Sequence, residues 1–242
     1  MPPFDPKKNG RLPLFLEVCQ RLHKAAGNVI GVGSSVAGPF TIAAYLRGIN
    51  PILRDVLKEK KQVHRLMQYV TDACKAWIDL AAPIGVGISM ADPLASPSVL
   101  NPNMFREYVF PYFIQIIDYA WAKTGQKPSL HMCGRTEKIW PYLKQLHISS
   151  LSLDNVIDLS AASKEFGESF CLMGNVDPVK TIQAGPPEQI RQAVADCVAK
   201  AGKSPKGFVV ASGCQIPVGT PMAHVEAMLD AVRALGGDCR KQ

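Results

Sequence analysis

Short runs of continuous rather than alternating hydrophobicity recur along the chain, and a longer amphipathic segment follows each of them. Continuous hydrophobicity over a few residues is typical of a strand buried on both faces, as in a parallel sheet covered by helices. The alternation therefore predicts repeated βα units. The six predicted strands are 28–34, 83–89, 127–133, 148–154, 169–175 and 207–213.

Local signals mark the intervening helices. Asn101 followed by Pro102 predicts a helix start, because asparagine caps a helix and proline suits its first position. Apolar residues then recur every three or four positions as far as Ala120, and Pro111 inside this stretch should kink the helix. Further helices are predicted at 11–28, 186–202 and 221–237.

Repeated βα units form either a doubly wound sheet or a (β/α)8 barrel, and a closed barrel needs eight strands. The chain begins with a helix, as if the first two βα units of a barrel were missing, and a bare sheet edge there would be a liability. Those units lie elsewhere, or the chain is a fragment, or a partner covers the gap. Residues 1–242 contain no internal repeat or linker, so we expect one domain, incomplete at its N-terminus.

Composition limits the class of protein. Hydrophobic residues make up 47% of the chain, enough for a sizeable core, but no apolar run approaches the roughly 20 residues of a membrane span. The first ten residues lack the apolar core of a signal peptide. We therefore expect a cytoplasmic protein with no membrane association.

The net charge of +7 comes without a dense Lys/Arg run or an aromatic-interleaved basic stripe, which argues against nucleic-acid binding. A modest positive field suits an anionic small molecule or an acidic partner protein. Seven cysteines without a secretion signal argue against a disulfide framework. Cys74, Cys171 and Cys197 fall in helical or strand patterns and are expected in the core.

Functional residues of parallel α/β folds lie at the carboxyl ends of the strands. The polar or sulfur-bearing residues at these predicted ends include Asp92, His131, Cys133, Asp154, Asn175, Cys214 and Gln215.

Three of these residues have the chemistry of a zinc site. His131 and Cys133 are two positions apart on a strand, so their side chains point the same way. Cys214 lies 81 residues later, at another strand end. Zinc prefers thiolate and imidazole ligands, and three protein ligands leave the open position of a catalytic site. The alternative is that both cysteines are buried core thiols and that His131 is a hydrogen-bonded strand-end histidine.

Five longer motifs carry a resemblance to a known family: "GPFTIAAYLRG" (38–48), "ADPLASPSVLNPNMFREYVFPY" (91–112), "HMCG" (131–134), "GNVDP" (174–178) and "SGCQIP" (212–217). With these motifs the chain resembles the uroporphyrinogen decarboxylase superfamily over nearly its whole length. Within it, the chain is most similar to the cobalamin-dependent methyltransferase branch, which includes the methylcobamide:coenzyme M methyltransferases. The His-x-Cys pair with a distant cysteine separates this branch from the decarboxylases, which lack that zinc set.

The resemblance implies a (β/α)8 barrel of which the six strands are the last six. It implies zinc ligation by His131, Cys133 and Cys214, with Asp154 as the match to an acidic residue that completes the shell in related methyltransferases. It also implies a reaction, in which a thiol held as thiolate by zinc takes the methyl group of a methyl-corrinoid, leaving Co(I). The chain lacks an Asp-x-His-x-x-Gly corrinoid-binding signature, so the corrinoid should arrive on a separate protein.

Several points stay open. Asp92, Asn175 and Gln215 are candidates to bind polar groups of the substrate, but Asp92 and Asn175 can equally cap the helices that follow them. The acceptor is coenzyme M, homocysteine, another thiol or a folate. Decarboxylation of a tetrapyrrole carboxylate, which needs no metal, and a non-catalytic partial barrel that binds a corrinoid protein are the alternatives. A homodimer is one of the oligomeric states that the sequence leaves open.

Overall fold

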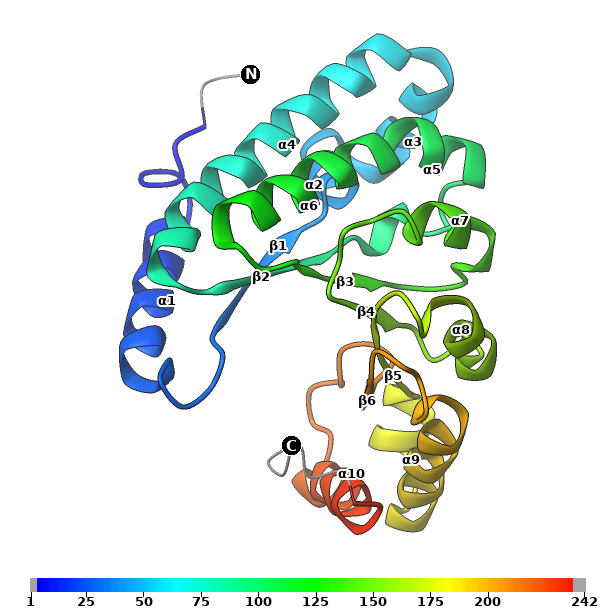
Figure 1. Cartoon of the computed structure of the whole chain (residues 1–242). Helices are drawn as coiled ribbons and strands as arrows, with labels where there is room; N and C mark the ends of the chain where they lie inside the picture. The colour runs from blue at the N-terminus through cyan, green and yellow to red at the C-terminus, as the bar shows by residue number, and fades with distance from the viewer. Residues whose placement is uncertain (1–3, 237–242) are drawn as a thin grey trace. The chain divides into compact units, whose positions relative to one another are not determined.

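The computed structural model describes residues 4–236 (Figure 1). Six strands alternate with helices, and all the strand pairs within each part of the chain are parallel. The predicted α/β class is thereby confirmed. Each predicted strand overlaps an observed one, but the first two observed strands begin at Gly33 and Gly87, later than the predicted starts at 28 and 83. Cys239 and the last residue of the predicted helix 221–237 lie outside the described residues.

The chain divides into two compact units, one made of the residues up to 131 with 138–149, the other of 132–137 with the residues from 150 onward. The expectation of a single domain stays a prediction. No helix within residues 4–236 has the length and apolar character that crossing a membrane requires.

The first unit carries three parallel strands and most of the helices. Its elements are α1 (Leu12–Ala26), β1 (Gly33–Ala37), α2 (Pro39–Arg47), α3 (Ile49–Lys58), α4 (Lys60–Ala81), η1 (Ala82–Ile84), β2 (Gly87–Ala91), η2 (Pro93–Ala95), α5 (Pro102–Tyr108), α6 (Phe110–Thr124), β3 (Ser129–Met132) and α7 (Trp140–Leu143). The short η3 (Glu137–Ile139) precedes α7.

One face of the first unit's sheet carries only small side chains beside His131. The register pairs Ser35 with Ser89 and Ser89 with Ser129, and one step further along the strands it pairs Ala37 with Ala91 and Ala91 with His131. Residues in register share a face of the sheet. The imidazole of His131 therefore shares its face with two alanines, which end at Cβ and leave room beside it.

The region that the sequence predicts as one kinked helix is two helices. α5 ends at Tyr108 and α6 begins at Phe110, with Pro111 in its first turn. Proline lacks the N–H group that a helix interior needs, whereas the first turn has no use for it, so the chain breaks there rather than bending. The predicted cap is confirmed, because the Asn101 side chain accepts a hydrogen bond from the Met104 N–H at 3.0 Å.

The second unit carries the other three strands. Its elements are β4 (Ser150–Leu153), α8 (Leu159–Phe166), β5 (Cys171–Val176), the π-helical η4 (Pro178–Gln183), α9 (Pro187–Ala201), β6 (Phe208–Ser212) and α10 (Met222–Ala234). Val176, Ile182, Val194 and Ala231 pack in its core together with Cys197. The predicted core place of Cys197 is thereby confirmed, and Cys74 is likewise buried in α4, while Cys171 is half-buried.

The cap at the start of α5 gives a direct test of the local structure. Replacing Asn101 with alanine should lower the free energy of unfolding by about 1 kcal/mol, because the Met104 N–H loses its acceptor. Asn103→Ala, at an exposed position two residues into the same helix, is the matched control and should be neutral or slightly stabilising, since alanine favours helices. Urea unfolding of both variants measures the difference, and equal midpoints would contradict the assigned cap.

Candidate metal centre

The structure brings three of the predicted residues together. His131 lies near the end of β3, Cys133 follows that strand directly, and Cys214 comes two residues after the end of β6. One ligand atom from each lies within 4.8 Å of the other two, and the two cysteine sulfurs are 3.8 Å apart. All three side chains are half-buried, so a small ion or molecule can reach them.

This spacing fits a tetrahedral zinc ion. Two thiolate sulfurs, each about 2.3 Å from zinc, lie about 3.8 Å apart when the angle between them is tetrahedral. A disulfide would require a sulfur–sulfur distance of about 2.05 Å, so the two cysteines do not form one with each other. One nitrogen and two sulfurs also make the soft donor set that zinc prefers over magnesium or calcium. The residues therefore fit zinc, with one coordination position left for a further ligand.

Asp154 makes other contacts and is not part of this group. One carboxylate oxygen accepts a hydrogen bond from the Gly134 N–H at 2.7 Å, and the other accepts from the Val156 N–H at 3.2 Å. Asp154 thus engages the backbone beside Cys133. Its predicted place in the metal shell stays a prediction.

The predicted substrate-binding residues of the second unit have different surroundings. The side-chain amide of Asn175 is buried and donates to the carbonyls of Asp154 at 2.9 Å and Ile157 at 2.7 Å. It therefore ties the end of β5 to the segment after β4. Gln215 is exposed, directly after Cys214. A role for either residue in substrate binding stays a prediction.

Asp92 is fully buried after β2 and caps a helix that precedes it in the chain. Its carboxylate accepts hydrogen bonds from the N–H groups of Phe40 and Thr41, both at 2.9 Å, in the first turn of α2. A Cβ at Gly38 would lie 2.2 Å from the Asp92 Cβ, so only glycine lets the two segments approach this closely. Burial raises the pKa of Asp92 to about 6, although these hydrogen bonds and the Thr41 hydroxyl oppose the shift.

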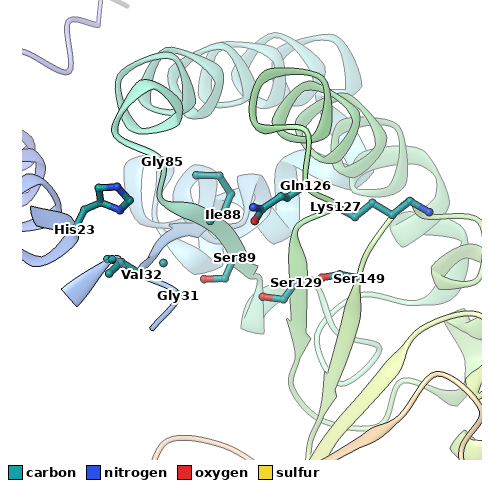
Figure 2. Close-up of a pocket in the computed structure, with 13 residues that line it drawn as sticks. His23, Gly31, Val32, Gly85, Ile88, Ser89, Gln126, Lys127, Ser129 and Ser149 are labelled. Atoms are coloured by element: carbon teal, nitrogen blue, oxygen red, sulfur yellow. The ribbon is translucent and has the colours of Figure 1, made fainter. Parts of the chain in front are cut away.

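A cavity of about 450 Å³ in the first unit was not predicted (Figure 2). It lies at the first residues of β1, β2 and β3, whereas His131 lies at the other end of β3. Figure 2 shows the side chains of His23, Gln126 and Ser89 around it, while Lys127 extends away, with its ammonium group 4.9 Å from the centre of the Trp121 ring. Gly31, Gly33, Gly85 and Gly87 line this cavity, and the sequence predicts them only as parts of the strands 28–34 and 83–89.

Comparison with known proteins adds the family. The profile of the family described as uroporphyrinogen decarboxylase (URO-D) matches residues 1–235 of the chain. The chain belongs to the URO-D family. The resemblance inferred from the motifs is confirmed at this level.

Members of the URO-D family with a corrinoid or coenzyme M activity in their names are among the most similar relatives. The methylated-thiol–coenzyme M methyltransferase of Methanosarcina mazei is 27% identical over 229 residues, which cover 94% of this chain and 59% of that protein. The methylcobamide:CoM methyltransferase MtbA of Methanosarcina acetivorans is 25% identical, covering 93% of this chain and 64% of its own length. The chain thus spans about three fifths of the length of these relatives.

A solved structure supports the fold. A methyltransferase from Methanosarcina mazei superimposes with a TM-score of 0.86 at 23% sequence identity, covering 97% of this chain and 67% of that one. At this identity the match establishes the α/β fold of the chain.

The buried carboxyl of Asp92 predicts a pH dependence of stability. The folded state binds this proton more tightly than the unfolded chain, because the pKa is about 6 when folded and near 3.8 otherwise. The stabilising contribution is therefore fully present below pH 3.8 and is lost as the pH rises through about 6. Asp92→Asn has a similar side-chain volume but cannot titrate, so the wild type minus variant difference in unfolding free energy should fall over this range.

Urea unfolding at half-unit pH intervals measures that difference. A difference that is flat from pH 4 to pH 7, or one that rises with pH, would contradict the raised pKa.

Proposed function

We propose that the chain is the zinc-binding part of a methyltransferase that moves a methyl group from a methyl-corrinoid, carried on a separate protein, to a thiol such as coenzyme M. The observation that carries this proposal is the convergence of His131, Cys133 and Cys214, whose ligand atoms lie within 4.8 Å of one another with the two sulfurs 3.8 Å apart. The decarboxylases that the chain also resembles need no metal. A set of three soft ligands therefore favours methyl transfer over decarboxylation.

The residues of the chain would hold and orient the reactants. His131, Cys133 and Cys214 would hold the ion, and when bound the zinc supplies the Lewis acidity that keeps an acceptor thiol deprotonated and nucleophilic. Ala37 and Ala91 share the sheet face of His131 and leave room beside it for an acceptor. With the thiol already deprotonated, no side chain is required as a general base.

The partners follow from the names of the relatives and from the sequence. MtbA is named for a methylcobamide donor and coenzyme M acceptor. A donor presented by a separate corrinoid protein is part of the proposal, and the net charge of +7 would favour an acidic one. A cytoplasmic location belongs to the same proposal.

The alternative function is decarboxylation of a tetrapyrrole carboxylate, which the family description itself favours. It makes the opposite prediction about metal, because that reaction would proceed without zinc. A chain that binds a corrinoid protein without catalysis is the third outcome.

Metal analysis combined with an activity assay tests the proposal. Purified wild type should hold one zinc per chain and transfer methyl groups from methylcobalamin to coenzyme M. Cys214→Ser should lose the zinc and at least about 100-fold of the rate, since the ion loses one of its three protein ligands. Cys171→Ser, which changes a half-buried cysteine outside the group, is the matched control and should retain both.

Wild-type protein without zinc, or Cys214→Ser with unchanged methyl transfer, would contradict the proposal. Formation of coproporphyrinogen from uroporphyrinogen by metal-free protein would establish the decarboxylase instead. A folded chain with zinc but with neither activity would support the non-catalytic alternative.

A further inference from the structure

The segment that follows β4 contacts both of the turns that carry the two cysteines. Asp154 and Asn155, which we call the 154–155 brace, touch the residue directly after Cys133 and the residue directly before Cys214. All of these residues belong to the second unit, so the contacts lie within one compact part of the chain.

The first contact fixes the turn after Cys133. Gly134 has a φ of 70°, in the left-handed region that favours glycine, and its N–H donates to the Asp154 carboxylate at 2.7 Å. This N–H belongs to the peptide group that joins Cys133 to Gly134. A hydrogen bond from it to a carboxylate is a strong one, so it holds the Cys133 backbone in one orientation.

The second contact fixes the turn before Cys214. Gly213 is buried, and a Cβ at that position would lie 2.3 Å from the Asn155 nitrogen and 2.7 Å from the Asn155 Cβ. The Gly213 N–H donates to the Val176 carbonyl at 2.8 Å, which continues the pairing of β5 with β6. The Asn155 backbone therefore limits where the turn bearing Cys214 can begin.

The brace is itself held from several sides. The second Asp154 oxygen accepts from the Val156 N–H, and the buried amide of Asn175 donates to the carbonyls of Asp154 and Ile157. The Asn155 side chain donates to the Asp177 carboxylate at 3.2 Å. These bonds tie the brace to the end of β5, so a displacement of either cysteine turn would strain a connected set of contacts.

We infer that Asp154 is a positioning residue which, with Asn155, holds the Cys133 and Cys214 sulfurs at metal-ligand spacing before any metal binds. The purpose of the brace rests on the proposed function, whereas the contacts that form the brace are between residues of the chain itself. The Cys133 and Cys214 sulfurs lie 3.8 Å apart, the separation that two thiolates on a tetrahedral zinc ion would have. Preorganised ligands need no rearrangement on binding, which raises metal affinity.

Two variants and two matched controls test the brace. Asp154→Asn leaves one side-chain oxygen for the two N–H groups of Gly134 and Val156 and sets an NH2 group against the other, and Gly213→Ala adds a Cβ that Asn155 must move away from. Asp158→Asn is the control for the first variant. The Asp158 carboxylate accepts a hydrogen bond from the N–H two residues later, that of Ser160 at 2.9 Å, just as Asp154 accepts one from Val156. Gly31→Ala is the control for the second, since Gly31, like Gly213, has no positive φ and a Cβ there meets nothing within 4 Å.

The first measurement uses metal-free protein. The protein is equilibrated with oxidised and reduced dithiothreitol. Cys133 and Cys214 form a disulfide while the oxidised reagent is reduced, and peptide mapping gives the fraction of chains that carry it. This fraction gives the effective concentration of one thiol for the other. Both brace variants should lower this effective concentration at least about tenfold, while both controls should match wild type. Circular dichroism identifies any variant that does not fold, and the other variant then carries the test.

The second measurement uses cobalt(II) as a spectroscopic probe. Brace variants should bind cobalt about 10- to 100-fold more weakly than wild type and, at saturation, give the wild-type absorption spectrum, because the ligands are unchanged. An altered saturated spectrum in Asp154→Asn with unchanged disulfide closure would make Asp154 a ligand and overturn the inference. Brace variants indistinguishable from their controls in the metal-free measurement would also overturn it.

The two proposals fail in different ways. Wild-type protein that binds no metal defeats the proposed function, whereas the disulfide measurement still decides whether the brace sets the sulfur spacing.

Discussion

Parallel strand pairing is the constraint on which this site depends. In a parallel sheet the strands end at a common edge, so residues far apart in sequence meet there without any long-range contact of their own. In the second unit the pairing of Val176 with Ser212 aligns the ends of β5 and β6, and the Gly213 N–H extends that pairing by one further hydrogen bond. Cys214 follows this glycine, and its sulfur lies 3.8 Å from the sulfur of Cys133.

Carboxylates and sulfur ligands have different tasks at these strand ends. Asp92 accepts hydrogen bonds from the first turn of α2, and Asp154 accepts them from Gly134 and Val156. Both acids therefore satisfy backbone N–H groups that would otherwise lack partners. The residues that could hold a metal ion are instead His131, Cys133 and Cys214.

The fold could be predicted because strands buried on both faces leave a sequence signal that depends on nearby residues alone. The meeting of Cys133 and Cys214 could also be predicted, because strand ends of a parallel sheet share an edge. The sequence predicts one helix kinked at Pro111, whereas the structure has two helices that meet just before it. Proline is compatible with either arrangement, so the sequence alone does not distinguish a kink from a break. That outcome depends on packing, which local pattern does not contain.

The contacts of the two aspartates could not be predicted in the same way. Asp92 meets residues about fifty positions earlier, and Asp154 meets Gly134 twenty positions earlier, and each contact depends on which way a carboxylate turns. The nearest sequence signal was the glycine beside each contact, Gly38 for Asp92 and Gly134 for Asp154. Glycine marks where two segments approach closely, but not which segment approaches.

X-ray absorption at the zinc edge tests the central claim most directly. The account predicts a first shell with two sulfur atoms at about 2.3 Å and a histidine nitrogen at about 2.0 Å, with a third sulfur appearing when coenzyme M is added. A shell of nitrogen and oxygen alone, or one that the thiol leaves unchanged, would contradict it.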